Sequence, residues 1–95
     1  MKMLTVIYDS AIDRSLMGLL EEMEIPVWTK LFGIHGQGQS GLKVNTPVWP
    51  GSNFEIRVAG DEPTLREIAS NIRTLQAEFK LQPGIFMTLQ EIENL

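Results

Sequence analysis

The stretch FEIRVAGDEPTLREIASNIRTLQAEF, residues 54–79, predicts a β-strand that leads directly into an α-helix. In its first part Phe54, Ile56 and Val58 alternate with charged residues, which is the pattern of a strand with one buried face. Asp61 follows, and its carboxylate can accept a hydrogen bond from a free backbone N–H at the start of a helix. Apolar residues then recur every three or four positions, as on the buried side of a helix. They are Leu65, Ile68, Ala69, Ile72, Leu75 and Phe79. The segment therefore indicates one complete strand–helix unit.

The first third of the chain has the same organisation. Residues 3–8, MLTVIY, are mostly β-branched or apolar and predict a strand. Asp9 or Ser10 can cap a helix that runs to about Glu24, where a proline two positions later prevents its continuation. The apolar residues of this helix are again three and four apart: Ile12, Leu16, Leu19, Leu20 and Met23. A second strand is predicted to begin at Val27, so the unit is followed directly by another strand.

A final strand is predicted over residues 85–92, IFMTLQEI, which completes the order βαββαβ. This order is typical of the ferredoxin-like sandwich. In this α+β fold a four-stranded antiparallel sheet carries both helices on one face. Because 95 residues are enough for one small core and not for two, we expect a single domain over residues 1–95.

The first and last strands of this pattern are mostly apolar on both faces. Leu4 and Val6 fall on one side of the first strand, but Met3 and Ile7 on the other side are apolar too. In the last strand, Phe86 is likewise an apolar residue on the second side. A sheet face that meets water should instead be polar. We therefore expect a second copy of the chain to cover this face, in a homo-oligomer.

Composition argues against several classes of function. The formal net charge of −4, with scattered Lys and Arg, argues against binding to nucleic acid. The lack of cysteine excludes disulfides and thiolate metal sites, and it makes a reducing cytoplasm the expected compartment. No apolar run is long enough for direct insertion into a membrane. Without a cysteine nucleophile or paired carboxylates near the glycine-rich segment, we expect neither catalytic residues nor an enzyme.

The connection between the second and third strands, residues 36–52, is rich in glycine and long for a simple hairpin. Glycines at positions 36, 38 and 41 permit positive φ and allow backbone N–H groups to approach an anion closely. The segment is not a Walker loop, which needs G-x-x-x-x-G-K-[ST], nor a dinucleotide fingerprint, since no helix follows. From these residues alone, an anion cradle and a bent hairpin without ligand remain equally open. We expect its tip, at residues 41–45, to be the first segment that proteases cleave.

At this point the chain resembles the PII-like signal-transduction superfamily. The run Gly36-Gln37-Gly38-Gln39 stands where these proteins carry the glycine and glutamine motif at the base of their flexible T-loop, and Thr29 resembles the threonine near their bound adenine. The resemblance implies a homotrimer that binds ADP, ATP or AMP between subunits and signals through the loop 36–52. It implies a small-molecule effector, a regulated transporter or enzyme as partner, and a sensor without catalytic activity.

The resemblance is incomplete near the last strand. There the family carries a second phosphate-binding loop, T-G-x-x-G-D-G-K, whereas this chain has AEFKLQPG, in which Lys80 and Gly84 are the matching residues. His35 beside the glycines is the single histidine, and one histidine without further ligands makes a poor metal site. We therefore expect no metal here. The predicted ligand-binding residues are Thr29, His35, Gly36, Gln37, Gly38, Gln39 and Lys80.

Two alternatives share the predicted fold. One is a metal-responsive trimer that resembles the divalent-cation-tolerance proteins. The other is an amino-acid-binding regulatory domain with the same βαββαβ order, which would form a dimer. The mass of the assembly separates the dimer, and titration with nucleotides and with copper, zinc and nickel separates the two kinds of trimer.

Overall fold

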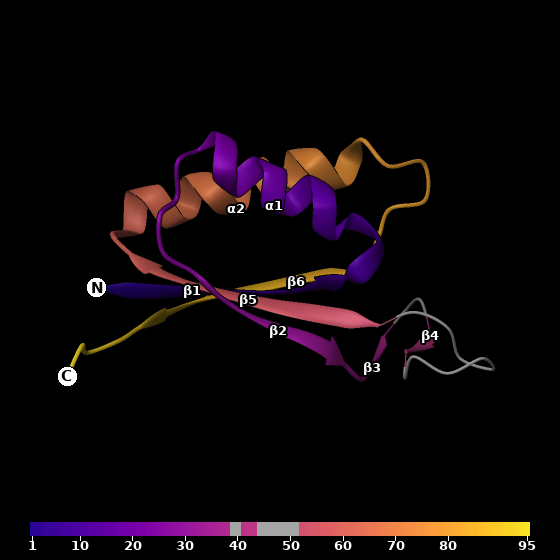
Figure 1. Cartoon of the computed structure of the whole chain (residues 1–95), viewed down its shortest axis with the longest axis horizontal. Helices are drawn as coiled ribbons and strands as arrows, with labels where there is room; N and C mark the ends of the chain where they lie inside the picture. The colour runs from indigo at the N-terminus through magenta and orange to yellow at the C-terminus, as the bar shows by residue number, and fades with distance from the viewer. Residues whose placement is uncertain (39–40, 44–51) are drawn as a thin grey trace.

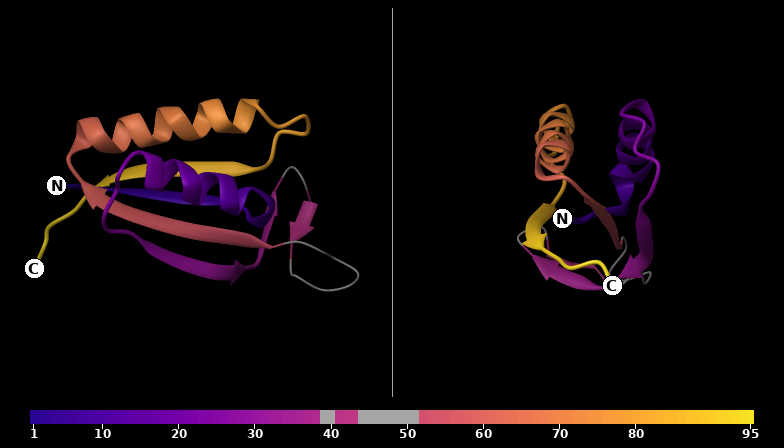
Figure 2. Two further views of the ribbon diagram at one scale, coloured as in Figure 1. Left: turned by 45° about the horizontal axis from the view of Figure 1, so that its top comes forward. Right: turned by 90° about the vertical axis from the view of Figure 1, so that its left-hand side faces the viewer.

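The computed structural model describes residues 1–38, 41–43 and 52–95 of the chain (Figure 1). Two helices lie side by side over one face of a four-stranded sheet, and a second, two-stranded sheet lies beyond one end of it (Figures 1 and 2). The elements in chain order are β1 (Lys2–Asp9), η1 (Ser10–Ile12), α1 (Asp13–Glu22), β2 (Thr29–Ile34), β3 (Gly36–Gly38), β4 (Gly41–Lys43), β5 (Asn53–Gly60), α2 (Glu62–Ala77) and β6 (Ile85–Glu91).

The larger sheet has the strand order β2-β5-β1-β6, and every neighbouring pair in it is antiparallel. The first strand is therefore central, with β5 on one side and β6 on the other. In the right-hand view of Figure 2 the two helices cover one side of this sheet and leave the other side without a helix. This arrangement confirms the ferredoxin-like α+β sandwich that the sequence predicts.

The helix starts follow the predicted caps. The Asp61 carboxylate accepts the backbone N–H of Thr64 at 3.0 Å, at the start of α2. The Asp9 carboxylate accepts the N–H of Ala11 at 2.9 Å, so the first cap precedes the short η1 turn instead of α1 itself. Both acids thus satisfy backbone groups that no preceding turn of helix can satisfy.

The predicted bounds of α1 and β2 need correction. The helix ends at Glu22, before the predicted Glu24, because Glu24 has a positive φ of 58° that a continuing helix cannot accommodate. The second strand begins at Thr29, so Val27 and Trp28 belong to the connection between the helix and the strand. A left-handed residue that is not glycine carries no sequence signal, which explains the difference.

The core lies between the helices and the sheet. Side chains at alternate strand positions lie on one face of the sheet, and side chains three or four positions apart lie on one face of a helix. These two faces pack against each other and exclude water. The buried apolar residues are Leu4, Val6, Tyr8, Ile12, Leu16, Leu20, Ile56, Val58, Leu65, Ile68 and Ile72. Ala69, Leu75 and Phe79, which the sequence also placed on the buried stripe, are partly buried and pack against this core.

The glycine-rich connection contains regular structure that its composition did not predict. Strands β3 and β4 pair antiparallel, with Gly36 opposite Lys43 and Gly38 opposite Gly41. Glycine is unfavourable in strands, so a pattern based on propensity reads this segment as irregular. Of the predicted cleavage-prone tip, residues 41–43 form β4, while 44–45 lie outside the described residues, as does Gln39.

Candidate functional site

The candidate site begins on β2, the edge strand that leads into the glycine-rich hairpin. Thr29, Lys30 and Leu31 pair in register with β5, and the register then shifts before Ile34. Gly33 lies inside this irregularity with a φ of +62°, a conformation that side chains other than glycine rarely adopt. A bulge of this kind redirects the strand. It therefore sets the direction in which the chain enters β3.

The constraint on Gly36 is different from the one predicted. Its φ is not in the left-handed region; that conformation occurs at Gly33 instead. A Cβ at Gly36 would lie 3.0 Å from the Nδ2 atom of Asn53, the first residue of β5. A side chain there would have to displace the Asn53 amide. Gly36 thus allows the hairpin to lie against the end of the large sheet.

The polar neighbours of Gly36 are accessible. The side chains of His35 and Gln37 are exposed, on the connection after β2 and on β3 respectively. Gly38 closes the described part of β3, opposite Gly41. Gln39, the fourth residue of the predicted motif, lies outside the described residues. Four of the predicted ligand-binding residues therefore lie together in sequence and in space, at one end of the large sheet.

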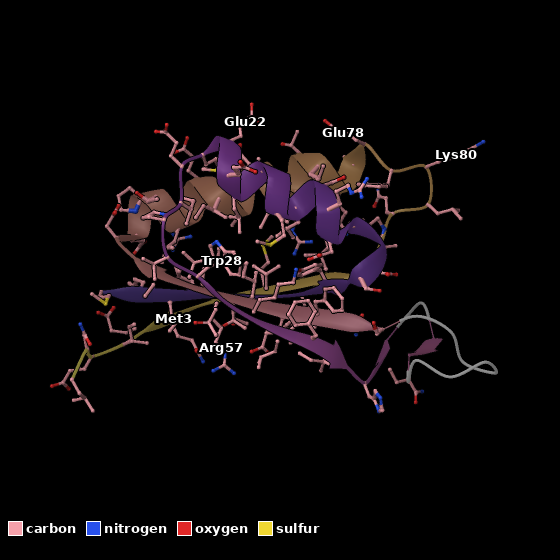
Figure 3. The ribbon with its side chains drawn as sticks, viewed as in Figure 1. Met3, Glu22, Trp28, Arg57, Glu78 and Lys80 are labelled. Carbon is pink, nitrogen blue, oxygen red and sulfur yellow. The ribbon has the colours of Figure 1, made fainter. Side chains whose placement is uncertain are left out.

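Thr29 lies at the opposite end of the same strand. It is exposed and pairs with Arg57, and Figure 3 shows Arg57 on the side of the sheet away from the helices. A strand rises about 3.3 Å per residue, which separates Thr29 from Gly36 by roughly 20 Å. Within one chain these two predicted residues do not contact the same atom of a small ligand.

Lys80 lies on the connection between α2 and β6, and its side chain points outward (Figure 3). Hydrogen bonds hold this connection in place. The Gln76 amide donates to the Pro83 carbonyl at 2.7 Å, and the Asp9 N–H donates to the Gly84 carbonyl at 3.2 Å. The connection is at the same end of the molecule as β3, on the helix side (Figure 1). The structure therefore does not bring Lys80 beside the hairpin glycines of its own chain.

A partly buried ion pair connects β2 to the start of α1. The ammonium of Lys30 lies 2.7 and 2.8 Å from the two carboxylate oxygens of Asp13, and the Lys30 side chain is only 9% exposed. It also lies over the rings of Phe32 and Phe54, at 4.7 and 5.2 Å from their centroids. Both rings attract a cation through their faces. The Asp13 carboxylate and the two aromatic rings together therefore stabilise the positive charge of Lys30.

Tyr8 extends this network into the core. Its hydroxyl donates to the Asp13 carboxylate at 2.6 Å, and the residue is fully buried. Burial, together with the hydrogen bond and the negative charge of Asp13, raises the pKa of Tyr8, so the phenol stays protonated. Sequence analysis missed this group. Its signal is a lysine at a strand position that faces the helices, because such a charge needs a buried partner.

The side of the sheet away from the helices, here called the open face, carries a row of apolar side chains. The register aligns Leu31, Glu55, Ile7 and Phe86 across all four strands. Phe86 is 63% exposed and Leu31 is 44% exposed. Glu55 in this row accepts a 2.6 Å hydrogen bond from the Nε atom of Arg57. Three of the four residues in this row are thus apolar, whereas the neighbouring row on the same face, Thr29, Arg57, Thr5 and Thr88, is polar.

Residues 1–38, 41–43 and 52–95 contain neither a cluster of metal ligands nor a helix suited to a membrane. Within these ranges no three His, Cys, Asp or Glu side chains gather closely enough to bind a metal ion. Neither of the helices found there has both the length and the apolar character needed to cross a bilayer.

Comparison with known proteins gives structural matches without sequence matches. No protein family matches the sequence, and no curated protein matches it either. The structure is similar to CPII, a nitrogen regulatory PII-like protein from Thiomonas intermedia K12 whose structure is bound to ADP, AMP and bicarbonate. The TM-score is 0.70 at 15% identity, over 96% of this chain and 86% of that one.

A second similar structure belongs to a candidate PII-like signalling protein from Thermus thermophilus. Its TM-score is 0.63 at 16% identity, over 94% of this chain and 83% of that one. Both matches span nearly the whole chain, and at these identities they establish its architecture. This chain has the fold of PII-like proteins.

Proposed function

We propose that this chain is a divergent PII-like regulatory protein, which forms a homotrimer and binds an adenine nucleotide between its subunits. The observation that carries the proposal is the match of 96% of the chain to a PII-like protein bound to ADP and AMP. The glycine and glutamine run after β2 supports it, because this segment stands where PII-like proteins have the base of their T-loop.

The open face supports the assembly. An exposed phenylalanine in line with Ile7 and Leu31 is costly for a monomer in water, since burial of such side chains stabilises by about 25 cal/mol per Å². Two further copies of the chain would remove this surface from water. The clefts between copies would then be bounded by residues of two chains.

The hairpin supplies the anion-binding part of the proposed site. Backbone N–H groups near Gly36 and Gly38, with the Gln37 and Gln39 amides, would bind the phosphates without a cluster of positive charge. His35 would contact the ligand at the edge of the hairpin. Thr29 would lie near the base, at the other end of β2. Since Lys80 does not approach the hairpin of its own chain, we assign its positive charge to the cleft of a neighbouring subunit.

The proposed output is a change in the segment 36–52 when the ligand binds, which a regulated transporter or enzyme would recognise. The bulge at Gly33 and the position of Gly36 close to Asn53 support a base that is held against the sheet. A ligand on the hairpin would therefore act on a segment whose described base, β3, follows directly from the edge strand of the sheet. The role is regulatory and requires no bond to be made or broken.

Calorimetric titration with ADP, ATP and AMP tests the proposal. We expect saturable binding by the natural protein and none by the Gly38→Val variant, because a side chain would occupy the place of the ligand oxygens. Gln39→Ala should weaken binding by about 1 kcal/mol, the usual contribution of one neutral hydrogen bond. Gly18→Ala is the matched control, since a Cβ at this exposed helix position meets nothing within 4 Å.

The outcomes of this titration are distinct. Equal binding by the Gly38→Val variant and the natural protein would contradict the role of the hairpin. Heat with copper, zinc or nickel, and none with any nucleotide, would instead favour the metal-responsive alternative.

A further inference from the structure

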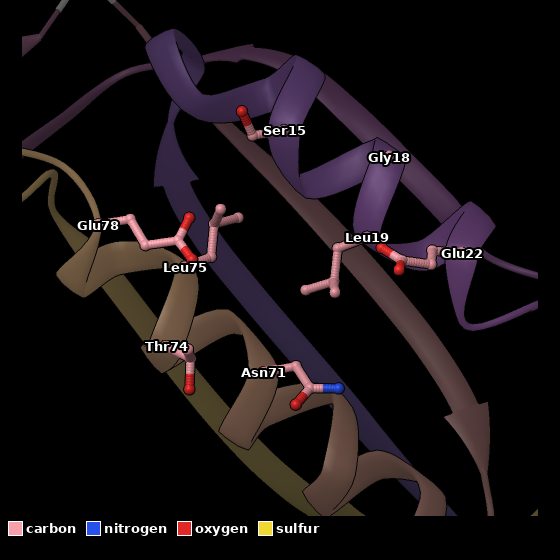
Figure 4. A pocket seen from close by; sticks show the side chains of 8 residues that line it. All are labelled: Ser15, Gly18, Leu19, Glu22, Asn71, Thr74, Leu75 and Glu78. Carbon is pink, nitrogen blue, oxygen red and sulfur yellow. The ribbon is translucent and has the colours of Figure 1, made fainter.

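A groove of about 440 Å³ lies between α1 and α2, on the surface away from the sheet (Figure 4). Leu19 and Leu75 face one another across it, and both are partly buried against the core. Gly18 borders the groove without a side chain, and a Cβ added there would meet nothing within 4 Å. The groove therefore has an apolar floor and one open wall.

Carboxylates stand at the two ends of this groove. Glu22 is the last residue of α1 and Glu78 is the C-cap of α2, and Figure 4 shows them at opposite ends. A helix C-terminus is the negative end of the helix dipole, and neither helix has a basic residue in its last turn. Both carboxylates are thus in an unfavourable field that a cation would relieve.

These two carboxylates also differ from others on the surface. Glu62 pairs with Arg66 at 2.8 Å and Glu91 pairs with Lys2 at 2.6 Å. Within the described ranges, by contrast, the side-chain carboxylates of Glu22 and Glu78 have no hydrogen-bond or ion-pair partner.

Arg73, a basic residue of α2, does not neutralise the negative charge of the groove. Arg73 donates to the Gln76 side chain at 3.0 Å and to the Ile85 carbonyl at 3.3 Å. These contacts hold its guanidinium toward β6, so no basic side chain lines the groove in the part of the chain that the structure describes. The charge of its lining is negative and its floor is apolar, which defines the chemistry of a complementary partner.

We propose that this groove binds an amphipathic helix of a partner protein that carries two basic residues two turns apart. The groove extends along α1 from Ser15 to Glu22. This distance is about 10.5 Å at the helical rise of 1.5 Å per residue. A partner helix laid along it would place Lys or Arg at positions i and i+7 near the two carboxylates. Leucines at i+3 and i+4 would contact Leu19 and Leu75. This surface is separate from the nucleotide site and does not depend on it.

A dye-labelled helical peptide with Lys at i and i+7 and Leu at i+3 and i+4 is the probe, and fluorescence anisotropy measures its binding to the whole protein. The comparison peptide has Glu in place of both lysines. We expect the protein to bind the lysine peptide and to bind the glutamate peptide at least tenfold more weakly, because charge at the ends of the groove decides the fit.

Charge reversal in the protein distinguishes binding at this groove from nonspecific attraction of a basic peptide to an acidic protein. Glu22→Lys and Glu78→Lys should each lower the affinity for the lysine peptide about tenfold, since an attraction becomes a repulsion of similar size. The double variant should prefer the glutamate peptide. Glu67→Lys changes the net charge equally at an exposed position of α2 outside the groove, and it should change binding less than twofold. Circular dichroism checks that each variant is folded.

Three results would overturn the proposal. They are no binding of the lysine peptide to the natural protein, equal affinity for both peptides, and an effect of Glu67→Lys as large as that of Glu22→Lys. None of them bears on nucleotide binding, which the calorimetric titration tests independently.

Discussion

The two faces of the large sheet are built from the same strands and have different surroundings. Toward the helices, Leu4, Val6 and Ile56 are at most 2% exposed, and the helix stripes complete the core around them. On the open face, Phe86 and Leu31 remain 63% and 44% exposed. One face is thus satisfied within a single chain, and the other is not.

The difference teaches that burial within the chain does not account for all of its apolar strand residues. A strand that is polar on its outer face would suffice for a ferredoxin-like monomer. Here Leu31, Ile7 and Phe86 lie in one row with Glu55, and we expect this row to contact another copy of the chain. We therefore expect substitutions on the two faces to affect different properties, folding on one and assembly on the other.

The largest effect should come from a charge on the open face. Phe86→Glu or Ile7→Lys would place an unpaired charge in the proposed subunit interface, at a cost of several kcal/mol. We expect the assembly to dissociate, with sedimentation velocity as the measurement and circular dichroism as the check on folding. Leu81→Glu is the control, because Leu81 is already 89% exposed on a connection. An unchanged sedimentation coefficient for both open-face variants would contradict the interface.

The helix-covered face should respond through the stability of the fold. Leu16 is fully buried on α1, so Leu16→Ala removes core contacts and leaves a cavity, at about 3 kcal/mol in the free energy of unfolding. Urea denaturation at a fixed protein concentration measures this loss. Leu81→Ala, the same change at an exposed site, should cost less than about 0.5 kcal/mol. Similar losses for both variants would show that α1 does not pack as described.

The Lys30–Asp13 pair lies at the edge of the covered face, and its loss should have an effect between those of Leu16→Ala and Leu81→Ala. Lys30→Met keeps the length of the side chain and leaves the partly buried Asp13 carboxylate without its cation. We expect a loss of about 2 kcal/mol in the free energy of unfolding, because a partly buried charge becomes unpaired. The double variant Lys30→Met, Asp13→Asn should recover part of it. Additive losses in this double-mutant cycle would contradict direct coupling of the two side chains.

The smallest effect should come from acid titration of the surface. Lys2 lowers the pKa of Glu91 and Arg66 lowers that of Glu62, while the Thr64 N–H lowers the pKa of Asp61. A pKa that is lower in the folded chain gives stability that is present above the unfolded pKa, here 4.5 for Glu and 3.8 for Asp, and is lost as the pH falls through the folded value.

The melting temperature should therefore decline modestly below about pH 4.5. It should decline less in Glu91→Gln, which removes one of these carboxylates, and less in 1 M salt, which screens exposed charges. A melting temperature that rises on acidification would contradict these ion pairs.

The sequence predicted the architecture because its strands and helices repeat with clear periods. The run 54–79 alone predicts a strand, the N-cap of the following helix and the apolar stripe of that helix, and the structure contains all three. Boundaries were predicted less well where backbone conformation decided them, as at Glu24. Periodicity reports which side of an element is buried, and it does not report a single left-handed residue.

The candidate site was less accessible to sequence reasoning. The glycines of the hairpin were identified, but the reason for a glycine at position 36 depends on a residue distant in sequence, since an added Cβ would lie 3.0 Å from the Asn53 amide. Lys30 and Asp13 are 17 residues apart, and only the folded chain brings them together. The groove between α1 and α2 likewise depends on how two helices pack, which no single stretch of sequence specifies.

The mass of the natural protein in solution tests the central claim most directly. Light scattering at micromolar concentration should give about three times the 10.7 kDa of one chain, because we propose that the chain forms a homotrimer through its open face. A mass of one chain would contradict both the interface on the open face and the proposed clefts between subunits. A mass of two chains would favour the dimeric amino-acid-binding alternative.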